Sequence, residues 1–164
     1  MHLSAIAIPV LLALSVVHPQ PSRGQTISMA AAAGPSFLPG SGHLGDGHAL
    51  LGVGIERKAL GARLEAMYEG VPGADLVALT GNLVWILRRG TLADTEPYLI
   101  AGIGSYVKFT ESRFGLNGGV GVHRRMGPIR LFAEIRYHRV TSQFEEAGSA
   151  DTFVPVSLGV MLGR

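Results

Sequence analysis

Carboxylates and imidazoles are the side chains that most often transfer protons in proteins, and the 164-residue chain contains 12 acidic residues and six histidines. Glu65, Glu134, His123 and His138 offer such groups within regular, alternating segments. The chain has no cysteine, which excludes a disulfide scaffold, a thiolate metal site and a cysteine nucleophile. The histidines are scattered without the spacing of a metal site. We therefore expect no catalytic group, metal or cofactor, and we expect the charged residues to form a structural network.

A serine–histidine pair and two glycine-rich segments could also indicate a catalytic or binding site, but neither lies in the structural setting that such a site needs. Acyl transfer needs a serine whose hydroxyl is held by a histidine, and residues 137–142 contain both His138 and Ser142. The alternation of that segment points His138 inward and leaves Ser142 in a connection. The glycine-rich residues 102–104 and 118–121 do not open a helix after a strand, so they do not form a dinucleotide loop. A net charge of +2, without a basic recognition helix, excludes nucleic acid as a partner.

The N-terminus reads as a targeting segment. Residues 3–17 form a mostly apolar run that is shorter than the roughly 20 residues of a membrane-spanning helix but fits a secretory signal. Small residues at Ser22 and Gly24 favour cleavage before Gln25. We predict a signal peptide over 1–24 and one mature domain over 25–164, the alternative being an uncleaved helical anchor.

The remaining chain is apolar and rich in glycine, and its hydrophobicity has a period of two. Hydrophobic residues make up 47% of the sequence and charged residues only 16%, with 23 glycines and a mean hydropathy of +0.31, which argues against disorder. Residues 60–69 and 129–138 place apolar side chains at every second position and mostly polar ones between them. Successive strand side chains point to opposite faces, so each segment is a strand with one apolar face.

The same alternation recurs in eight segments, at residues 26–33, 47–57, 60–69, 76–88, 97–109, 114–125, 129–138 and 153–164. Most run for about ten to thirteen residues, which suits tilted membrane-spanning strands better than the five or six of ordinary strands. The expected fold class is all-β: an eight-stranded antiparallel up-and-down transmembrane β-barrel, preceded by a signal peptide.

Aromatic residues and connection lengths orient this barrel. Long connections over 34–46 and 140–151 are expected at the outer end, with tight turns at 58–59 and 126–127 at the inner end. Outward-facing aromatic residues then fall near both membrane interfaces, as an aromatic girdle does: Tyr68, Phe109, Phe114 and Tyr137 at the outer end and Trp85 at the inner end.

The inward faces carry charge of both signs. The predicted lumen network consists of Glu56, Arg63, Glu65, Arg88, Arg130, Glu134, Arg136 and His138. An eight-stranded barrel is just wide enough for side chains to fill it, and charges withdrawn from water need partners. We expect ion pairs of Arg63 or Arg136 with Glu65 or Glu134, and a filled lumen instead of an open pore.

Four segments resemble the small outer-membrane β-barrel superfamily of Gram-negative-type bacteria, the OmpA/OmpX-like barrels: PYLIAGIG at 97–104, GGVGV at 118–122, FAEIRY at 132–137 and VPVSLGV at 154–160. The resemblance covers nearly all of the mature chain and implies a structural barrel, an adhesin, a small-solute pore or, rarely, a lipid enzyme. Its implied partners are outer-membrane lipid and the barrel-assembly machinery. Such barrels usually end in an aromatic residue, whereas this sequence ends at Arg164.

The sequence thus predicts a monomeric outer-membrane protein, exported by a cleaved signal peptide, with a structural or interaction role carried by its outer loops. Which extracellular ligand they would contact is open. One alternative is a narrow pore for small or hydrophobic solutes. A second is a soluble lipocalin-like barrel, which would turn the Leu, Val and Ile faces inward and the Arg and Glu faces to water.

Overall fold

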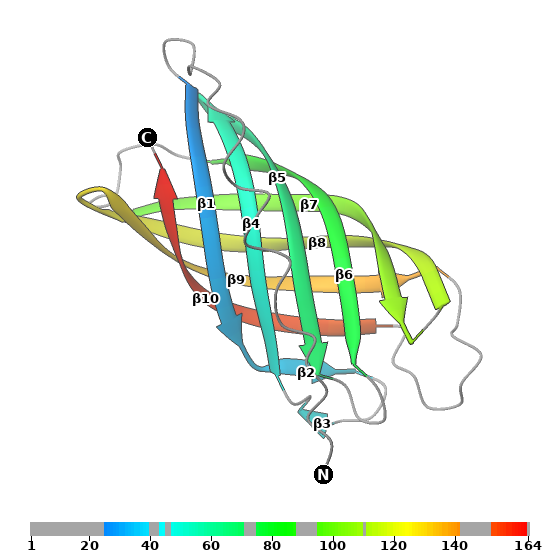
Figure 1. The fold of residues 1–164 in the computed structure, drawn as a ribbon. Coiled ribbons are helices and arrows are strands. Elements are labelled where there is room, and N and C mark those ends of the chain that lie inside the picture. The colour runs from blue at the N-terminus through cyan, green and yellow to red at the C-terminus, as the bar shows by residue number, and fades with distance from the viewer. Residues whose placement is uncertain are drawn as a thin grey trace, which may run out of the picture.

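The computed structural model describes residues 25–39, 43–44, 47–70, 75–87, 95–109, 111–141 and 152–163, the backbone alone at 43–44. Eight long strands build a barrel (Figure 1): β1 (Gln25–Gly34), β4 (Gly47–Arg57), β5 (Leu60–Gly70), β6 (Leu76–Ile86), β7 (Thr95–Lys108), β8 (Glu111–Met126), β9 (Ile129–Val140) and β10 (Thr152–Gly163). Two short strands, β2 (Ser36–Leu38) and β3 (His43–Leu44), follow β1. The predicted signal peptide lies outside the described residues.

Every long strand pairs antiparallel with the next, and β10 pairs back onto β1 from Ser28↔Gly163 to Ala33↔Leu158. This last pairing closes the sheet, so no long strand leaves an edge of unpaired backbone groups. The predicted eight-stranded antiparallel barrel is confirmed. Among the described residues, no helix is long and apolar enough to cross a membrane.

The barrel has two unlike ends. The tight connections at Lys58–Ala59 and Gly127–Pro128 lie at one end, which we call the turn end, together with the start of β1 and the end of β10. The connections β1–β4, β5–β6, β7–β8 and β9–β10 lie at the opposite end, the loop end. β8 begins at Glu111, three residues before the strand predicted at 114–125, so the β7–β8 connection is short.

Part of the predicted loop 34–46 is strand. β2 keeps the register of β1 along β10, since Pro155 pairs with Ser36 just as Leu158 pairs with Ala33. β2 also forms a short antiparallel pair with β3. The first hairpin therefore extends beyond the main barrel wall, and it buries Ser36 and Leu38 at the loop end. In the other long predicted connection, 140–151, residues 142–151 lie outside the described residues.

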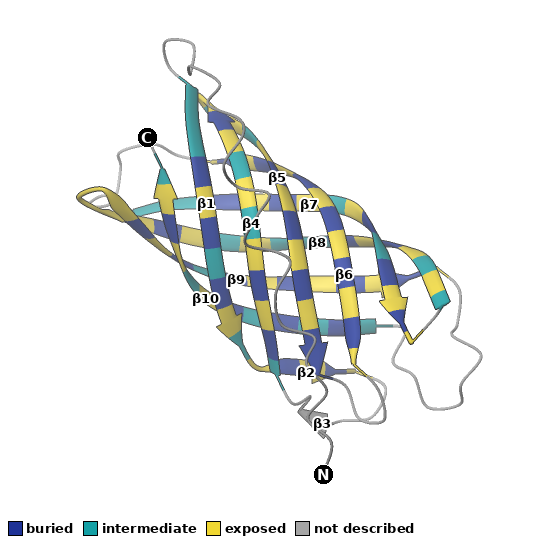
Figure 2. Cartoon of the chain, in the orientation of Figure 1, coloured by how far each residue is buried: buried dark blue, intermediate teal, exposed yellow. Residues whose placement is uncertain are grey.

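Burial alternates along every long strand (Figure 2). All eight long strands expose large apolar side chains, among them Leu79, Leu83 and Leu158. Over the described strands, outward positions carry charge only near strand ends, at Arg57, Arg124 and Arg139. Most charges of the strand centres are buried inside, which is the reverse of a water-soluble barrel.

The lumen is filled by polar and apolar side chains together. Apolar groups gather in a large cluster and a smaller one, and the larger contains Leu38, Leu50, Met67, Tyr106, Phe132, Phe153 and Met161. The smaller cluster consists of Val84, Ile86, Tyr98 and Ile100. Several of these inward apolar residues stand on strands that are apolar on both faces, where alternation of polarity carries no signal.

Inward glycines make room for this filling. An added Cβ at Gly121 would collide with the ring of Tyr98, whereas an added Cβ at the outward-facing Gly81 meets nothing within 4 Å. The two glycines therefore differ in what surrounds them and not in backbone conformation, since neither has a positive φ.

We predict that Gly121→Ala lowers the free energy of unfolding by about 1–3 kcal/mol, because overfilling a packed interior forces side chains or backbone to shift. Gly81→Ala is the matched control and should leave stability unchanged or raise it by up to about 1 kcal/mol, since it restricts only the unfolded chain. Urea unfolding in lipid vesicles measures both. Equal destabilisation by the two variants would contradict the packing described here.

Candidate functional site

Four charged residues from two strands meet at the centre of the lumen and form what we call the central charge cluster: Arg63, Glu65, Glu134 and Arg136. Arg136 binds Glu65 through two hydrogen bonds: Nη1 donates to Oε2 at 2.5 Å and Nη2 donates to Oε1 at 2.9 Å. The Nε of Arg136 donates a further hydrogen bond to Glu134. Arg63 Nη1 lies 3.4 Å from Glu134 Oε2. β5 and β9 are not sheet neighbours, so these contacts cross the lumen.

Neutral side chains complete the coordination of these carboxylates. Asn82 Nδ2 donates to Glu65 at 2.6 Å, and the hydroxyl of Tyr98 donates to Glu134 at 2.7 Å. The guanidinium of Arg63 also lies over the ring of Tyr98, 5.0 Å from its centroid. All four charged residues are nearly inaccessible to solvent. Two positive and two negative charges balance, which buried ions require.

A second set of charged and imidazole side chains makes polar contacts toward the turn end. Arg130 Nη1 donates to Glu56 Oε2 at 2.6 Å, and His123 Nε2 lies 2.8 Å from Glu96 Oε2. The His123 ring stacks on Tyr98, with 5.3 Å between centroids, and so links these pairs to the central charge cluster.

The loop end is closed by hydrogen bonds among uncharged and charged groups of four strands. Ser36 of β2 donates to Glu69 Oε2 at 2.7 Å and lies 3.3 Å from His48 Nδ1, while His48 Nε2 lies 2.7 Å from Ser157 Oγ. Serine, histidine and glutamate could serve acyl transfer, but all four side chains are buried and the hydroxyl of Ser36 donates its hydrogen bond to Glu69 instead of to His48. These hydrogen bonds connect β2 to β4 and β5 at the loop end of the barrel.

Of the predicted lumen residues, the structure brings six into ion pairs and leaves two apart. His138 is buried away from the carboxylates: Tyr106 O–H lies 2.9 Å from its Nδ1, and its ring stacks on Phe153 at 4.7 Å. Arg88 lies outside the described residues. The contacts of Ser36 with His48 and Glu69 were not predicted, because Ser36 was expected in a loop, although Glu69 faces inward as the alternation of its segment indicates.

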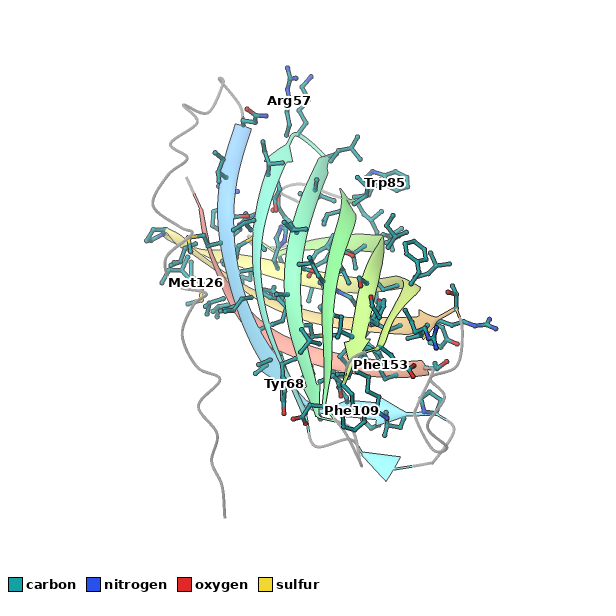
Figure 3. The ribbon with its side chains drawn as sticks, turned by 45° about the vertical axis from the view of Figure 1, so that its right-hand side comes forward. Arg57, Tyr68, Trp85, Phe109, Met126 and Phe153 are labelled. Atoms are coloured by element: carbon teal, nitrogen blue, oxygen red, sulfur yellow. The ribbon has the colours of Figure 1, made fainter. Side chains whose placement is uncertain are left out.

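The predicted girdle residues all face outward, with exposed fractions from 47% for Tyr68 to 65% for Phe109. Figure 3 shows Tyr68 and Phe109 at the loop end, and Trp85 toward the opposite end with Arg57. Phe37 of β2 is also outward and exposed, and it adds an aromatic ring at the loop end that the sequence pattern did not reveal.

Within the described residues, no group of three or more His, Asp or Glu side chains could hold a metal ion. The acids and imidazoles of the central charge cluster and of the loop end contact other buried side chains, whereas Glu56 and Glu96 also line a polar cavity at the turn end. The side chains of the lumen can close the barrel to solutes, because they fill its interior and connect strands on opposite sides.

The folds of known proteins place this geometry in context. No protein-family model and no curated sequence matches the chain. The crystal structure of Neisserial surface protein A (NspA) superposes with a TM-score of 0.64 at 16% identity, covering 85% of this chain and 96% of that one. A major outer membrane protein from Thermus thermophilus superposes with a TM-score of 0.57 at 14% identity, covering 85% and 99%.

The chain has the fold of the small outer-membrane β-barrels. The fold predicted from the sequence is therefore the fold that these solved structures share. Sequence identities this low show that the fold is shared, and they do not assign the activity of either solved protein to this chain.

The central charge cluster yields a stability prediction. Arg136→Met leaves Glu65 and Glu134 without their main partner, and stranding a buried charge costs about 3–5 kcal/mol. Glu111→Gln is the control, because its half-exposed ion pair with Arg113 contributes at most about 1 kcal/mol. Urea unfolding in vesicles measures both variants. A loss below about 1 kcal/mol for Arg136→Met would show that the cluster does not stabilise the barrel.

Proposed function

We propose that this chain is an integral protein of a bacterial outer membrane, exported by a cleaved signal peptide over 1–24, with a structural or interaction role. The observation that carries the proposal is the closed, apolar outer wall. Over the described strands, its outward charges stand only near strand ends, and its aromatic rings lie toward both ends. Such a wall is compatible with lipid, whereas exposing it to water would leave an apolar patch around the whole barrel.

The contents of the lumen favour interaction over transport or catalysis. Both the central charge cluster and the apolar groups around Phe153 cross the path that a solute would take. The soluble lipocalin-like alternative requires an apolar interior and a charged exterior, and the distribution of charge is the reverse. Because its interior is occupied, we infer that the protein acts through its loop end, that it is a monomer and that it is not an enzyme.

Outer-membrane lipid and the barrel-assembly machinery are the partners that this proposal requires. The outward faces support the first: Arg57 and Arg124 flank the turn end and can contact lipid phosphates, while Trp85 lies toward the same end. The terminal strand β10 supports the second, because β10 and β1 form the seam that assembly in a membrane must close.

Cell fractionation tests the location. The protein should sediment with the outer membrane and migrate faster on detergent gels when it is not heated, because a closed barrel stays compact until it is boiled. A freely soluble periplasmic pool would overturn the proposal.

Arginine substitutions on the outer wall test its contact with lipid. Leu79→Arg should lower the free energy of unfolding in bilayers by about 2–4 kcal/mol, whereas Leu87→Arg near the turn end should lower it by about 0–1 kcal/mol.

Planar-bilayer recording tests the closed lumen. Purified protein should give no large, steady single-channel conductance, because side chains occupy the barrel from the loop end to its centre. Arg136→Met serves as the comparison, since loosening the central charge cluster should raise the frequency of transient openings. A large conductance of the unaltered protein would favour the narrow-pore alternative.

A further inference from the structure

A shallow apolar depression of about 1030 Å³ lies on the outer wall, over β4, β5, β6 and β7, with its margins on β1 and β8. Small outward residues on three adjacent strands form its floor: Ala62, Gly81 and Ala101. An added Cβ at Gly81 meets nothing within 4 Å, so this position opens directly to the outside of the barrel. Larger exposed side chains surround it: Leu64, Leu83 and Ile103. The depression is therefore complementary to an apolar chain.

The depression lies within reach of one end of the barrel. Ile55 and Val53 line it on β4, two and four residues before the strand ends at Arg57. At roughly 3.3 Å per residue, they lie about 7 and 13 Å from that end. The hydrocarbon of one leaflet is about 15 Å thick, half of a bilayer core of about 30 Å. An acyl chain whose headgroup lies at the turn end would therefore run along the depression.

Two cations stand at the turn end of this depression. Arg57 is the last outward residue of β4, and Lys58 follows it in the β4–β5 turn. Both are exposed, and neither forms an ion pair among the described residues, since the adjacent Glu56 faces inward and binds Arg130. In Figure 3 the side chain of Arg57 extends beyond the strand ends. An anionic group that approaches the depression from this end meets both cations.

The backbone at Lys58 and the charge of the surrounding wall indicate the same direction. Lys58 has a φ of 56°, in the left-handed region that favours glycine or asparagine, so a cation is held here against the local backbone preference. Over the described residues of β4–β7, outward charge occurs only at Arg57. The loop end of the depression thus offers no charge to a headgroup, and a lipid would bind in one direction.

We propose that the depression binds one anionic phospholipid of the leaflet at the turn end, and this inference rests on the proposed membrane location. One acyl chain lies over Gly81, between Leu64 and Ile103. The phosphate accepts hydrogen bonds from Arg57 and Lys58. A zwitterionic lipid has the same chains but gains less from two cations, because its ammonium group offsets the phosphate charge. A second copy of the chain in the same orientation would bring like charges together at the turn end, which disfavours it.

The fluorescence of Trp85 tests the proposal, because this single tryptophan is outward and only Leu60 separates it from Arg57 across the sheet. The full chain is reconstituted in phosphatidylcholine vesicles that contain a small fraction of brominated phosphatidylglycerol or, for comparison, brominated phosphatidylcholine. Brominated phosphatidylglycerol should quench Trp85 at an about tenfold lower mole fraction.

The other outcomes separate this proposal from the membrane location. Equal quenching by the two lipids would overturn the lipid site and leave the location intact, whereas no quenching by either would overturn both. Quenching by both lipids that increases as the protein is diluted in lipid would indicate a second copy on the depression, and it would also overturn the lipid site.

Paired substitutions separate a site from general attraction to a basic end. Arg57→Gln with Lys58→Asn removes both cations, and asparagine suits the left-handed turn. Arg124→Gln with Arg125→Gln removes two exposed charges at the same end, far along β8 from the depression. The first pair should reduce the preference for phosphatidylglycerol to within about twofold of phosphatidylcholine, and the second should leave it unchanged. Equal losses would overturn the proposal.

Filling the depression tests the position of the acyl chain. Gly81→Leu should lower the preference for phosphatidylglycerol at least about threefold, because the new side chain occupies the floor. Ala133→Leu is the control, since Ala133 is outward on β9, which contributes nothing to the depression. An unchanged preference in Gly81→Leu would overturn the site, and heat-modifiable migration verifies that each variant is folded.

Discussion

The pairing of β1 with β10 closes the sheet, and the other features of the molecule depend on this closure. A closed antiparallel sheet satisfies its own backbone hydrogen bonds and has no long edge to protect. It also divides the side chains of every strand into an outward and an inward population. The outer wall can then be apolar all round, and the polar residues of the same strands must find partners within a narrow lumen.

That narrowness decides how the lumen is built. Eight strands leave space for side chains but not for bulk solvent, so the charges at the centre must be stabilised by neighbouring side chains. Arg136 meets this requirement by binding Glu65 and Glu134 from one guanidinium, and Tyr98 and Asn82 occupy further acceptor positions. Glycines such as Gly121 give the large rings their space. Rigidity, and not an open path, is the result.

The sequence was sufficient to predict the barrel, because the alternation of apolar and polar residues in segments such as 60–69 is satisfied by a β-strand with one apolar face. It also identified both sides of the central charge cluster, since Arg63, Glu65, Glu134 and Arg136 share the inward face. It could not say which arginine meets which glutamate, because that depends on how β5 and β9 face each other across the lumen. The closure at Ser36 escaped prediction because three residues are too few to show a period.

The central claim is that the outer wall faces lipid, and the single tryptophan of the chain can test it without any substitution. Trp85 is outward and 55% exposed, near the turn end. Its fluorescence should be quenched by lipids brominated on their acyl chains in reconstituted vesicles, most strongly by bromines close to the headgroups. The claim would be contradicted if no brominated lipid quenched the fluorescence of Trp85 while an aqueous quencher such as iodide quenched it freely.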